Sequence, residues 1–191
     1  MTTQTLLNQL IHSVQQHEAR TIDQPSLIQA GVLVAITDEI DPKLILTRRA
    51  DHLKTHSGEV AFAGGKRDDT DPDIVYTALR EAHEEIDLNS HDVRVIGQLD
   101  QVVSRFGYLV TPIVGIIPAD ITFTANLDEL DKIFKVPLRF FLETEPDDYF
   151  KRGSILIPSF HYDGFRIWGL TAMMITEMVN NHLNADISIR F

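Results

Sequence analysis

The sequence GGKRDDTDPDIVYTALREAHEEIDL, which spans residues 64 to 88, joins a glycine pair and an acidic stretch to a helical pattern. Asp71 is a good N-cap residue, Pro72 suits the first helical position, and Asp73 complements the positive end of a helix. Six apolar residues then recur at spacings of three and four: Ile74, Val75, Ala78, Leu79, Ala82 and Ile86. This spacing predicts a helix that begins after Asp71 and turns one apolar stripe toward the core.

Three glutamates follow on the predicted helix. At about 100° per residue, the carboxylates of Glu81, Glu84 and Glu85 share one face. Their mutual repulsion costs about 0.2–0.5 kcal/mol per pair, and Arg80 offsets only part of it. A divalent cation would turn this repulsion into coordination, and hard carboxylate oxygens suit Mg²⁺ or Mn²⁺. An ordinary solvated charged face is the alternative interpretation.

Basic residues and glycines precede the acidic stretch. We expect Gly64 and Gly65 to form a turn, where glycine permits positive φ and close approach of the backbone to a ligand. Upstream, Arg48, Arg49, Lys54 and His56 are candidate phosphate ligands, and surface charge is the competing interpretation. Downstream, Phe106 or Tyr108 is a candidate for stacking on a nucleobase, although an aromatic residue at the edge of the core is the favoured interpretation of either position.

The chain resembles the Nudix hydrolases in this region. Their motif is written G-x5-E-x7-R-E-U-x-E-E-x-G-U, where U is aliphatic, and the matching residues here are Gly65, Asp71, Arg80, Glu81, Glu84 and Glu85. Three departures occur: Asp71 replaces the first Glu, eight residues rather than seven separate it from Arg80, and Asp87 replaces the last Gly. Asp tolerates the left-handed conformation better than most residues, so a turn after the helix is still expected.

A second resemblance points to the coenzyme A pyrophosphatase branch of that family. Its extra signature, roughly L-L-T-x-R-(S/A)-x3-R-x3-G-x3-F-P-G-G, is similar to residues 46–50 and 58–65. Lys54 replaces the second Arg and Ala63 the Pro; Lys keeps the charge but lacks the bidentate fork of Arg. Residues 110–115, 136–138 and 167–172 also resemble this branch, so that the likeness covers about residues 28 to 180.

The resemblance implies an α/β fold, a Nudix-type α/β/α sandwich with a mixed sheet. It also implies that Glu81, Glu84 and Glu85 bind Mg²⁺ or Mn²⁺, that one of them acts as base, and that Arg80 orients the carboxylates. The implied substrate-binding residues are Arg48, Arg49, Lys54, Gly64, Gly65 and Phe106. The implied reaction cuts the diphosphate of coenzyme A or a thioester derivative into phosphopantetheine and adenosine 3′,5′-bisphosphate.

Two alternatives stay open. The chain could act on another small nucleoside diphosphate derivative, such as ADP-ribose or a dinucleotide. It could instead be a non-catalytic binding module of the same fold, which the departures at Lys54, Ala63, Asp71 and Asp87 favour. A module of that kind has no evident need for all three glutamates.

Composition narrows the classes of partner. The 191 residues fit one domain, 1–191, with residues 1–27 as a helical extension that packs on the domain or on a second subunit of a homodimer. A net charge of −11 argues against nucleic acid and anionic membranes. Without cysteine there is neither a disulfide nor a thiolate site, and a cytoplasmic location is expected. The sequence shows no export or membrane-spanning signal.

The remaining elements are expected in alternation, as in an α/β layer packing. Expected helices cover residues 6–14, 138–143 and 170–183, and expected strands cover 30–36, 44–47, 60–62, 93–99 and 109–117. Pro112 suggests an edge position or a bulge in its strand. Asp163 and Gly164 predict a β-hairpin over 160–168. Glu129, in an acidic stretch between elements, is a candidate distal acid.

Overall fold

The structure is a computed structural model that describes residues 5–53, 56–152 and 155–189. Its helices are α1 (Leu6–Gln15), α2 (Ile74–Ile86), the 3-10 helix η1 (Ser90–Asp92), α3 (Leu138–Glu143) and α4 (Gly169–Leu183). The strands of the main sheet are β1 (Ile28–Asp38), β2 (Lys43–Arg49), β3 (Val60–Ala61), β4 (Ala63–Lys66), β5 (Arg94–Gln98), β6 (Val102–Val103), β7 (Tyr108–Pro118) and β8 (Leu130–Pro137). A smaller sheet holds β9 (Asp148–Arg152), β10 (Ile155–Tyr162) and β11 (Phe165–Ile167).

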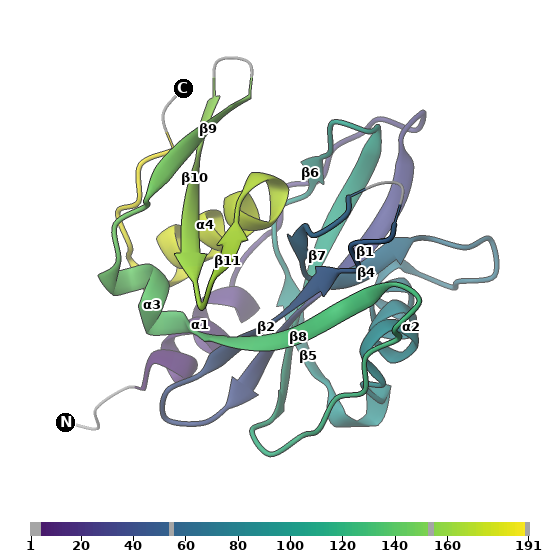
Figure 1. The fold of residues 1–191 in the computed structure, drawn as a ribbon, viewed down its shortest axis with the longest axis horizontal. Coiled ribbons are helices and arrows are strands. Elements are labelled where there is room, and N and C mark those ends of the chain that lie inside the picture. The colour runs from purple at the N-terminus through teal and green to yellow at the C-terminus, as the bar shows by residue number, and fades with distance from the viewer. Residues whose placement is uncertain (1–4, 54–55, 153–154, 190–191) are drawn as a thin grey trace.

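The main sheet is mixed and is covered on both faces. β1 pairs in parallel with β7 along its whole length and antiparallel with β2 and β4. Leu33 and Ala35 pack in the cluster that contains α2, whereas Val34 and Ile36 pack with α1 and α4. Figure 1 shows α2 on one side of the sheet and α1 and α4 on the other. A strand buried on both faces must be apolar at every position, which explains the unbroken hydrophobic run of β1. The predicted α/β class with a mixed sheet is confirmed.

Helix α2 carries the predicted apolar stripe but begins later than predicted. All six apolar residues of the stripe belong to the core between α2 and the sheet. The N-cap is Asp73, whose side chain accepts a hydrogen bond from the Tyr76 amide. The prediction that Asp71 caps the helix is therefore wrong, because its carboxylate binds Arg80 instead. At the other end, Asp87 adopts the left-handed conformation with φ 56°, as the sequence allowed.

Two backbone predictions need correction. The glycine pair does not form a turn: Gly64 and Gly65 lie in β4, paired with Val32 and Gly31 of β1. Pro112 does not lie in an edge strand, because β7 runs between β1 and β5. Its carbonyl accepts a hydrogen bond from the Leu99 amide, at the gap in pairing between β5 and β6. Proline has no N–H with which to complete this pair, at the point where the partner of β7 changes from β5 to β6.

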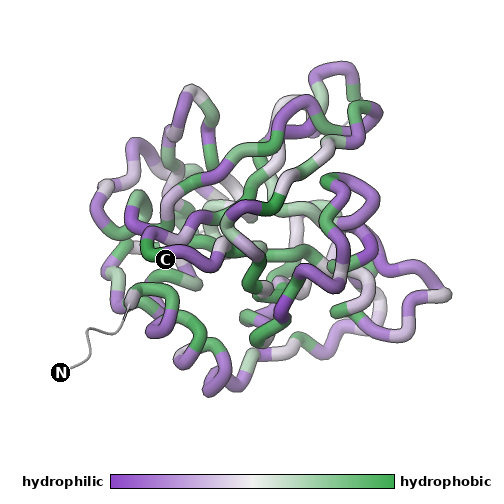
Figure 2. Tube along the Cα trace, turned by 90° about the horizontal axis from the view of Figure 1, so that it is seen from below, coloured by the Kyte–Doolittle hydropathy of each residue, from purple (hydrophilic) through white to green (hydrophobic). Residues whose placement is uncertain are grey.

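The C-terminal part forms the predicted hairpin and final helix. Asp163 and Gly164 have φ of 50° and 80°, the signs that a type I′ turn requires between β10 and β11. Strands β8 and β9 were not predicted, because their charged residues interrupt the alternation of apolar and polar residues that indicates a strand. Hydrophilic residues gather on the projecting loops in Figure 2. Helix α1 packs on α4 and β5 of its own chain through Leu7, Leu10 and Val14.

No helix in the described ranges combines the length and the apolar character needed to cross a membrane.

Candidate active site

The face of α2 that meets β4 presents two glutamates to the glycine pair. The amide of Gly64 donates a hydrogen bond to Glu85 Oε2 over 3.1 Å. A Cβ built on Gly65 would lie 2.5 Å from the carboxyl carbon of Glu81, so the carboxylate of Glu81 occupies space that any other residue would fill. The third glutamate, Glu84, is turned outward and its side chain is 55% exposed. The pairing of β4 with β1 thus brings Glu81 and Glu85 together beside a strand whose two glycines have no side chains.

Arg80 holds the acidic residues of this region in one network. Its Nη1 donates to Glu81 Oε1 at 2.8 Å and to Glu84 Oε2 at 3.0 Å. Its Nε and Nη2 donate to the two oxygens of Asp71 at 3.1 and 3.0 Å. Asp71 is buried, and the Arg80 guanidinium lowers its pKa to about 2. These contacts support the predicted role of Arg80 in orienting carboxylates, and they give Asp71 the role of anchoring Arg80.

Among the three glutamates of the site, Glu85 has the most strongly shifted pKa. Burial is the main cause that raises its pKa to about 7. The carboxylates of Glu129 and Glu81 also raise this pKa, whereas the hydrogen bond from the Gly64 amide and the charge of Arg49 lower it. Burial also raises the pKa of Glu81, against the opposing effect of Arg80. These raised pKa values mean that ionising the two carboxyl groups inside the fold costs free energy. A cation placed between these carboxylates would remove that cost.

The donor set suits a hard divalent cation, since carboxylate oxygens are the ligands that Mg²⁺ and Mn²⁺ prefer. Across the described ranges, however, no three His, Asp or Glu side chains already surround one point as metal ligands do. Glu81 and Glu84 instead share Nη1 of Arg80. Coordination by all three glutamates would require Glu84 to leave Arg80. Its exposed position leaves the side chain room to rotate.

A cavity of about 310 Å³ is lined by Gly64 and Arg49, which both contact Glu85, although none of the three glutamates lines it. Arg49 lines it, and Nη1 of Arg49 lies 3.9 Å from Glu85 Oε1. Nε of Arg49 is buried and has no hydrogen-bond partner among the described residues. Gly64 and the half-exposed ring of Phe106 also line the cavity. A cationic group with a free donor, next to a carboxylate cluster, suits a phosphate-bearing ligand.

His56, another candidate phosphate ligand, also lines the cavity, with its Nδ1 2.6 Å from Glu59 Oε2. Two other predicted binding residues lie outside the cavity. Arg48 forms ion pairs with Asp131 and Asp51 and does not line the cavity. Gly65 lies under Glu81. Lys54 lies outside the described residues.

Four residues outside the predicted set of site residues add to the site. Trp168 and Leu170 line the cavity, although only their likeness to the branch had drawn attention to them. Arg105 also lines it, stacked on Phe106 with its guanidinium carbon 4.5 Å from the ring centre. Glu129, named only as a distal acid, acts electrostatically on both Glu81 and Glu85.

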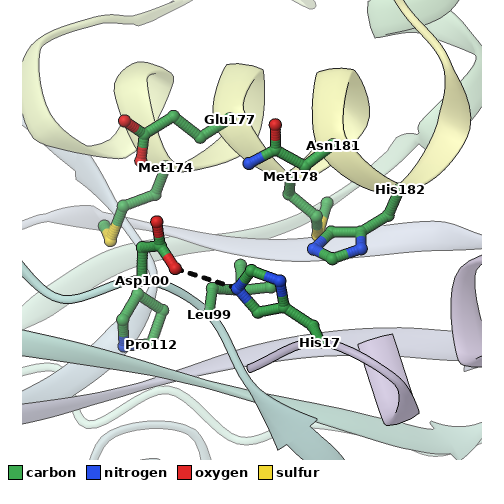
Figure 3. Close-up of a pocket in the computed structure, with 9 residues that line it drawn as sticks. All are labelled: His17, Leu99, Asp100, Pro112, Met174, Glu177, Met178, Asn181 and His182. Carbon is green, nitrogen blue, oxygen red and sulfur yellow. Dashed lines mark hydrogen bonds and ion pairs between the residues drawn. The ribbon is translucent and has the colours of Figure 1, made fainter. Parts of the chain in front are cut away.

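A second hollow lies where the chain after α1 meets α4 (Figure 3). Its volume is about 10 Å³, room for about one water molecule. His17 Nε2 and Asp100 Oδ1 are 2.9 Å apart across it, and Asp100 also accepts a hydrogen bond from the Arg20 amide. Because these polar groups are paired with one another, the hollow belongs to the docking of the N-terminal segment and not to a ligand site.

Replacing Gly65 by Ala tests whether the position of Glu81 matters. The new methyl group would collide with the Glu81 carboxylate and with no backbone atom among its three nearest neighbours. We expect a folded protein whose kcat falls by about tenfold to a hundredfold, because small misplacements of reacting groups cost that much. Steady-state kinetics with thermal unfolding as a folding control would measure this. An unchanged kcat would show that Glu81 need not occupy its present place.

Comparison with known proteins shows the family of this chain and agrees with its fold. The model of the NUDIX domain matches residues 27–142, so the chain belongs to the Nudix family. It is a Nudix hydrolase, 44% identical over 154 residues to a protein of Escherichia coli O7:K1 whose printed name is "Uncharacterized Nudix hydrolase NudL". The matched segment covers 78% of this chain and 80% of that relative. A homologue with the same name from Shigella boydii serotype 18 gives the same identity and coverage.

Solved structures confirm the fold at low sequence identity. A Nudix hydrolase from M. smegmatis, RenU, superposes with a TM-score of 0.56 at 16% identity, covering 85% of this chain and 90% of that chain. A MutT/nudix family protein from Enterococcus faecalis gives a TM-score of 0.53 at 13% identity, covering 93% of this chain and 70% of that one. At these identities the likeness extends to the fold alone.

Proposed function

We propose that this Nudix hydrolase cleaves the diphosphate bond of coenzyme A or its thioester derivatives, using a divalent cation. The observation that carries the proposal is the pair of carboxylates, Glu81 and Glu85, held against β4 beside a cavity with a basic wall at Arg49. The choice of substrate is supported by the likeness of residues 46–50 and 58–65 to the coenzyme A pyrophosphatase signature.

The site residues divide the work of hydrolysis. Glu81, Glu84 and Glu85 would hold Mg²⁺ or Mn²⁺, which when bound supplies charge neutralisation for the diphosphate and a more acidic water. Glu81 or Glu85 accepts the proton of the attacking water. The water oxygen bonds to one phosphorus, the bridging P–O bond breaks, and the departing phosphate takes the bridging oxygen. Arg49, which lines the cavity, binds a non-bridging oxygen of the diphosphate, and Arg80 keeps the carboxylates in place.

A substrate panel tests the proposal. The protein is incubated with Mg²⁺ or Mn²⁺ and coenzyme A, an acyl-coenzyme A, NADH, ADP-ribose or a dinucleotide, and the products are separated by chromatography. We expect phosphopantetheine, or its acylated form, and adenosine 3′,5′-bisphosphate. Cleavage of ADP-ribose or a dinucleotide alone would overturn the choice of substrate. No cleavage of any compound would favour a binding module.

The pKa of Glu85 makes metal binding depend on pH. A proton and a cation compete for this carboxylate, and its pKa of about 7 places the competition near neutrality. Between pH 6 and pH 8 we expect the affinity for Mn²⁺ to rise by about tenfold, since most of the carboxylate loses its proton in that range. Calorimetric titration at both pH values would measure the change. In Glu85→Gln the residual affinity should vary little with pH, and an equal rise in that variant would contradict the assignment.

A further inference from the structure

Strand β8, which runs beside β2 (Figure 1), is irregular next to the site. Its pairing with β2 is regular along most of its length, up to the pair of Arg48 with Lys132, but Arg49 then lies opposite Leu130. Asp131 is therefore an extra residue in β8, a β-bulge opposite the two arginines. Bulges are frequent next to active sites, where they turn side chains in a new direction.

The bulge decides which face of the sheet receives Leu130 and Asp131. Phe134 and Val136 pack in the cluster of α1 and α4, whereas Leu130, an even number of residues away, packs in the cluster of α2. Side chains alternate in a regular strand, so without the extra residue Leu130 would leave the α2 side and Asp131 would take its place. A carboxylate would then lie on the side of the sheet that α2 and its glutamates cover.

The guanidinium group of Arg48 holds the bulge from the other side. Its Nη1 donates to Asp131 Oδ2, and its Nη2 donates to Asp51 Oδ1 over 2.6 Å. Gly58 packs closely on this pair, since a Cβ built there would lie 3.1 Å from Arg48 Nη2. One side chain thus joins the bulge of β8 to the turn that follows β2.

Two groups of the site lie at this junction. Arg49, the residue after Arg48, lines the cavity with its Nη1 3.9 Å from Glu85 Oε1. The amide of the next residue, Ala50, donates a hydrogen bond over 2.8 Å to the carbonyl of Glu129, whose charge acts on Glu85. A slip of the bulge by one residue would therefore move both groups relative to Glu85.

We propose that Arg48 is a positioning residue for the hydrolysis and acts through Asp131. Their ion pair keeps the bulge in register, and the bulge in turn sets Arg49 and Glu129 beside Glu85. The inference rests on the proposed function for the reaction that these groups serve. Ion pairs that are partly exposed add little to stability, so removing this one should change the rate far more than the unfolding temperature.

Arg48→Gln tests the role, because it removes the charge while keeping a long polar side chain. We expect kcat on the compound cleaved fastest in the substrate panel to fall about tenfold, since small displacements of reacting groups cost at least this much. The midpoint of thermal unfolding should change by less than about 2 °C. Hydrogen exchange of the Ala50 amide, followed by NMR, should accelerate about tenfold as its bond to Glu129 opens more often.

Further variants locate the effect. If Arg48 and Asp131 act as a pair, Asp131→Asn should lower kcat as Arg48→Gln does, and the double variant should lose clearly less than the two losses combined. Arg48→Lys keeps the charge without the fork that reaches two carboxylates, and should recover part of the rate. Arg139→Gln is the matched control: it breaks the exposed ion pair with Asp41, whose atoms are 2.6 Å apart, and should leave kcat unchanged.

The outcomes separate this proposal from the proposed function. Unchanged exchange of the Ala50 amide in Arg48→Gln would overturn the positioning role, whichever compound is cleaved, and so would faster exchange with a normal kcat. If no compound is cleaved, the proposed function fails, and calorimetric titration with methylenediphosphonate and Mg²⁺ takes the place of kcat. A Kd about tenfold higher in Arg48→Gln would then support the role, because Arg49 would be displaced, and an unchanged Kd would overturn it.

Discussion

Replacing Glu85 by Gln is expected to lower kcat about a thousandfold while making the metal-free protein more stable above pH 7. The loss of rate follows from removing a ligand charge and a candidate base, whose contribution to proton transfer alone is about 10²–10⁴-fold. The gain in stability follows from burial. Glu85 is 4% exposed, and ionising it inside the fold costs free energy that a neutral amide avoids. Gln can still accept the hydrogen bond from Gly64.

The pKa fixes the pH range of this stabilisation. The folded pKa of Glu85, about 7, lies above the unfolded value of about 4.3, so the folded protein holds the proton more tightly. The stability of the unmodified protein should therefore fall between about pH 4.3 and pH 7 and change no further above that range on account of this group. At pH 8 the Gln variant should be more stable by about 3–4 kcal/mol, and at pH 4 the two should be alike.

Urea unfolding in EDTA at pH 4 and pH 8 measures both differences. Glu84→Gln is the matched control, because its side chain is 55% exposed and its neutralisation removes little buried charge. A Glu85→Gln protein that is no more stable than the original at pH 8 would show that the buried carboxylate of Glu85 does not destabilise the fold. A Glu85→Gln protein with normal kcat would remove Glu85 from the reaction.

The second large effect is expected for Arg80→Ala, which should destabilise the fold by about 3 kcal/mol and also abolish most activity. Asp71 is 4% exposed, and without Arg80 its charge would stay buried with only neutral partners. Leaving one member of a buried pair behind typically costs about 3–5 kcal/mol. Glu81 and Glu84 would also lose the guanidinium nitrogen that they share.

A double-mutant cycle with Asp71→Asn isolates the pair. If Arg80 and Asp71 stabilise each other, the double variant should lose clearly less than the sum of the two single losses. Arg94→Ala, at an exposed arginine of β5, should change the free energy of unfolding by less than about 0.5 kcal/mol. Additive losses at Arg80 and Asp71 would contradict the anchoring role of Asp71.

The pattern of apolar residues was sufficient to predict the helix and the two central strands on which the site is built. The spacing of three and four along α2 placed its apolar stripe correctly, because a helix packed on a sheet must bury one side. The apolar runs of β1 and β7 were equally clear, since both faces of the sheet are covered. Asp163 and Gly164 specified the hairpin because few residue pairs accept positive φ at both positions.

Partners distant in the sequence explain the errors. Asp71 satisfies the local rule for a helix cap, but Arg80, nine residues later, binds its carboxylate more favourably. Gly64 and Gly65 suit a turn locally, yet pairing with β1 makes them a strand.

The residues that line the cavity could not be predicted together, for the same reason. Arg49 and Trp168 line one cavity from positions more than a hundred residues apart, and no local pattern could join them. Sequence also placed the three glutamates on one face without showing that Glu84 turns outward to Arg80.

Anomalous diffraction from crystals soaked in Mn²⁺ tests the central claim most directly, because it locates the cation without reference to activity. We predict a peak at about 2.0–2.3 Å from carboxylate oxygens of Glu81 and Glu85, beside the Gly65 backbone, and its loss in Glu85→Gln crystals. A protein that hydrolyses its substrate with Mn²⁺ while the peak lies away from both glutamates would contradict the account.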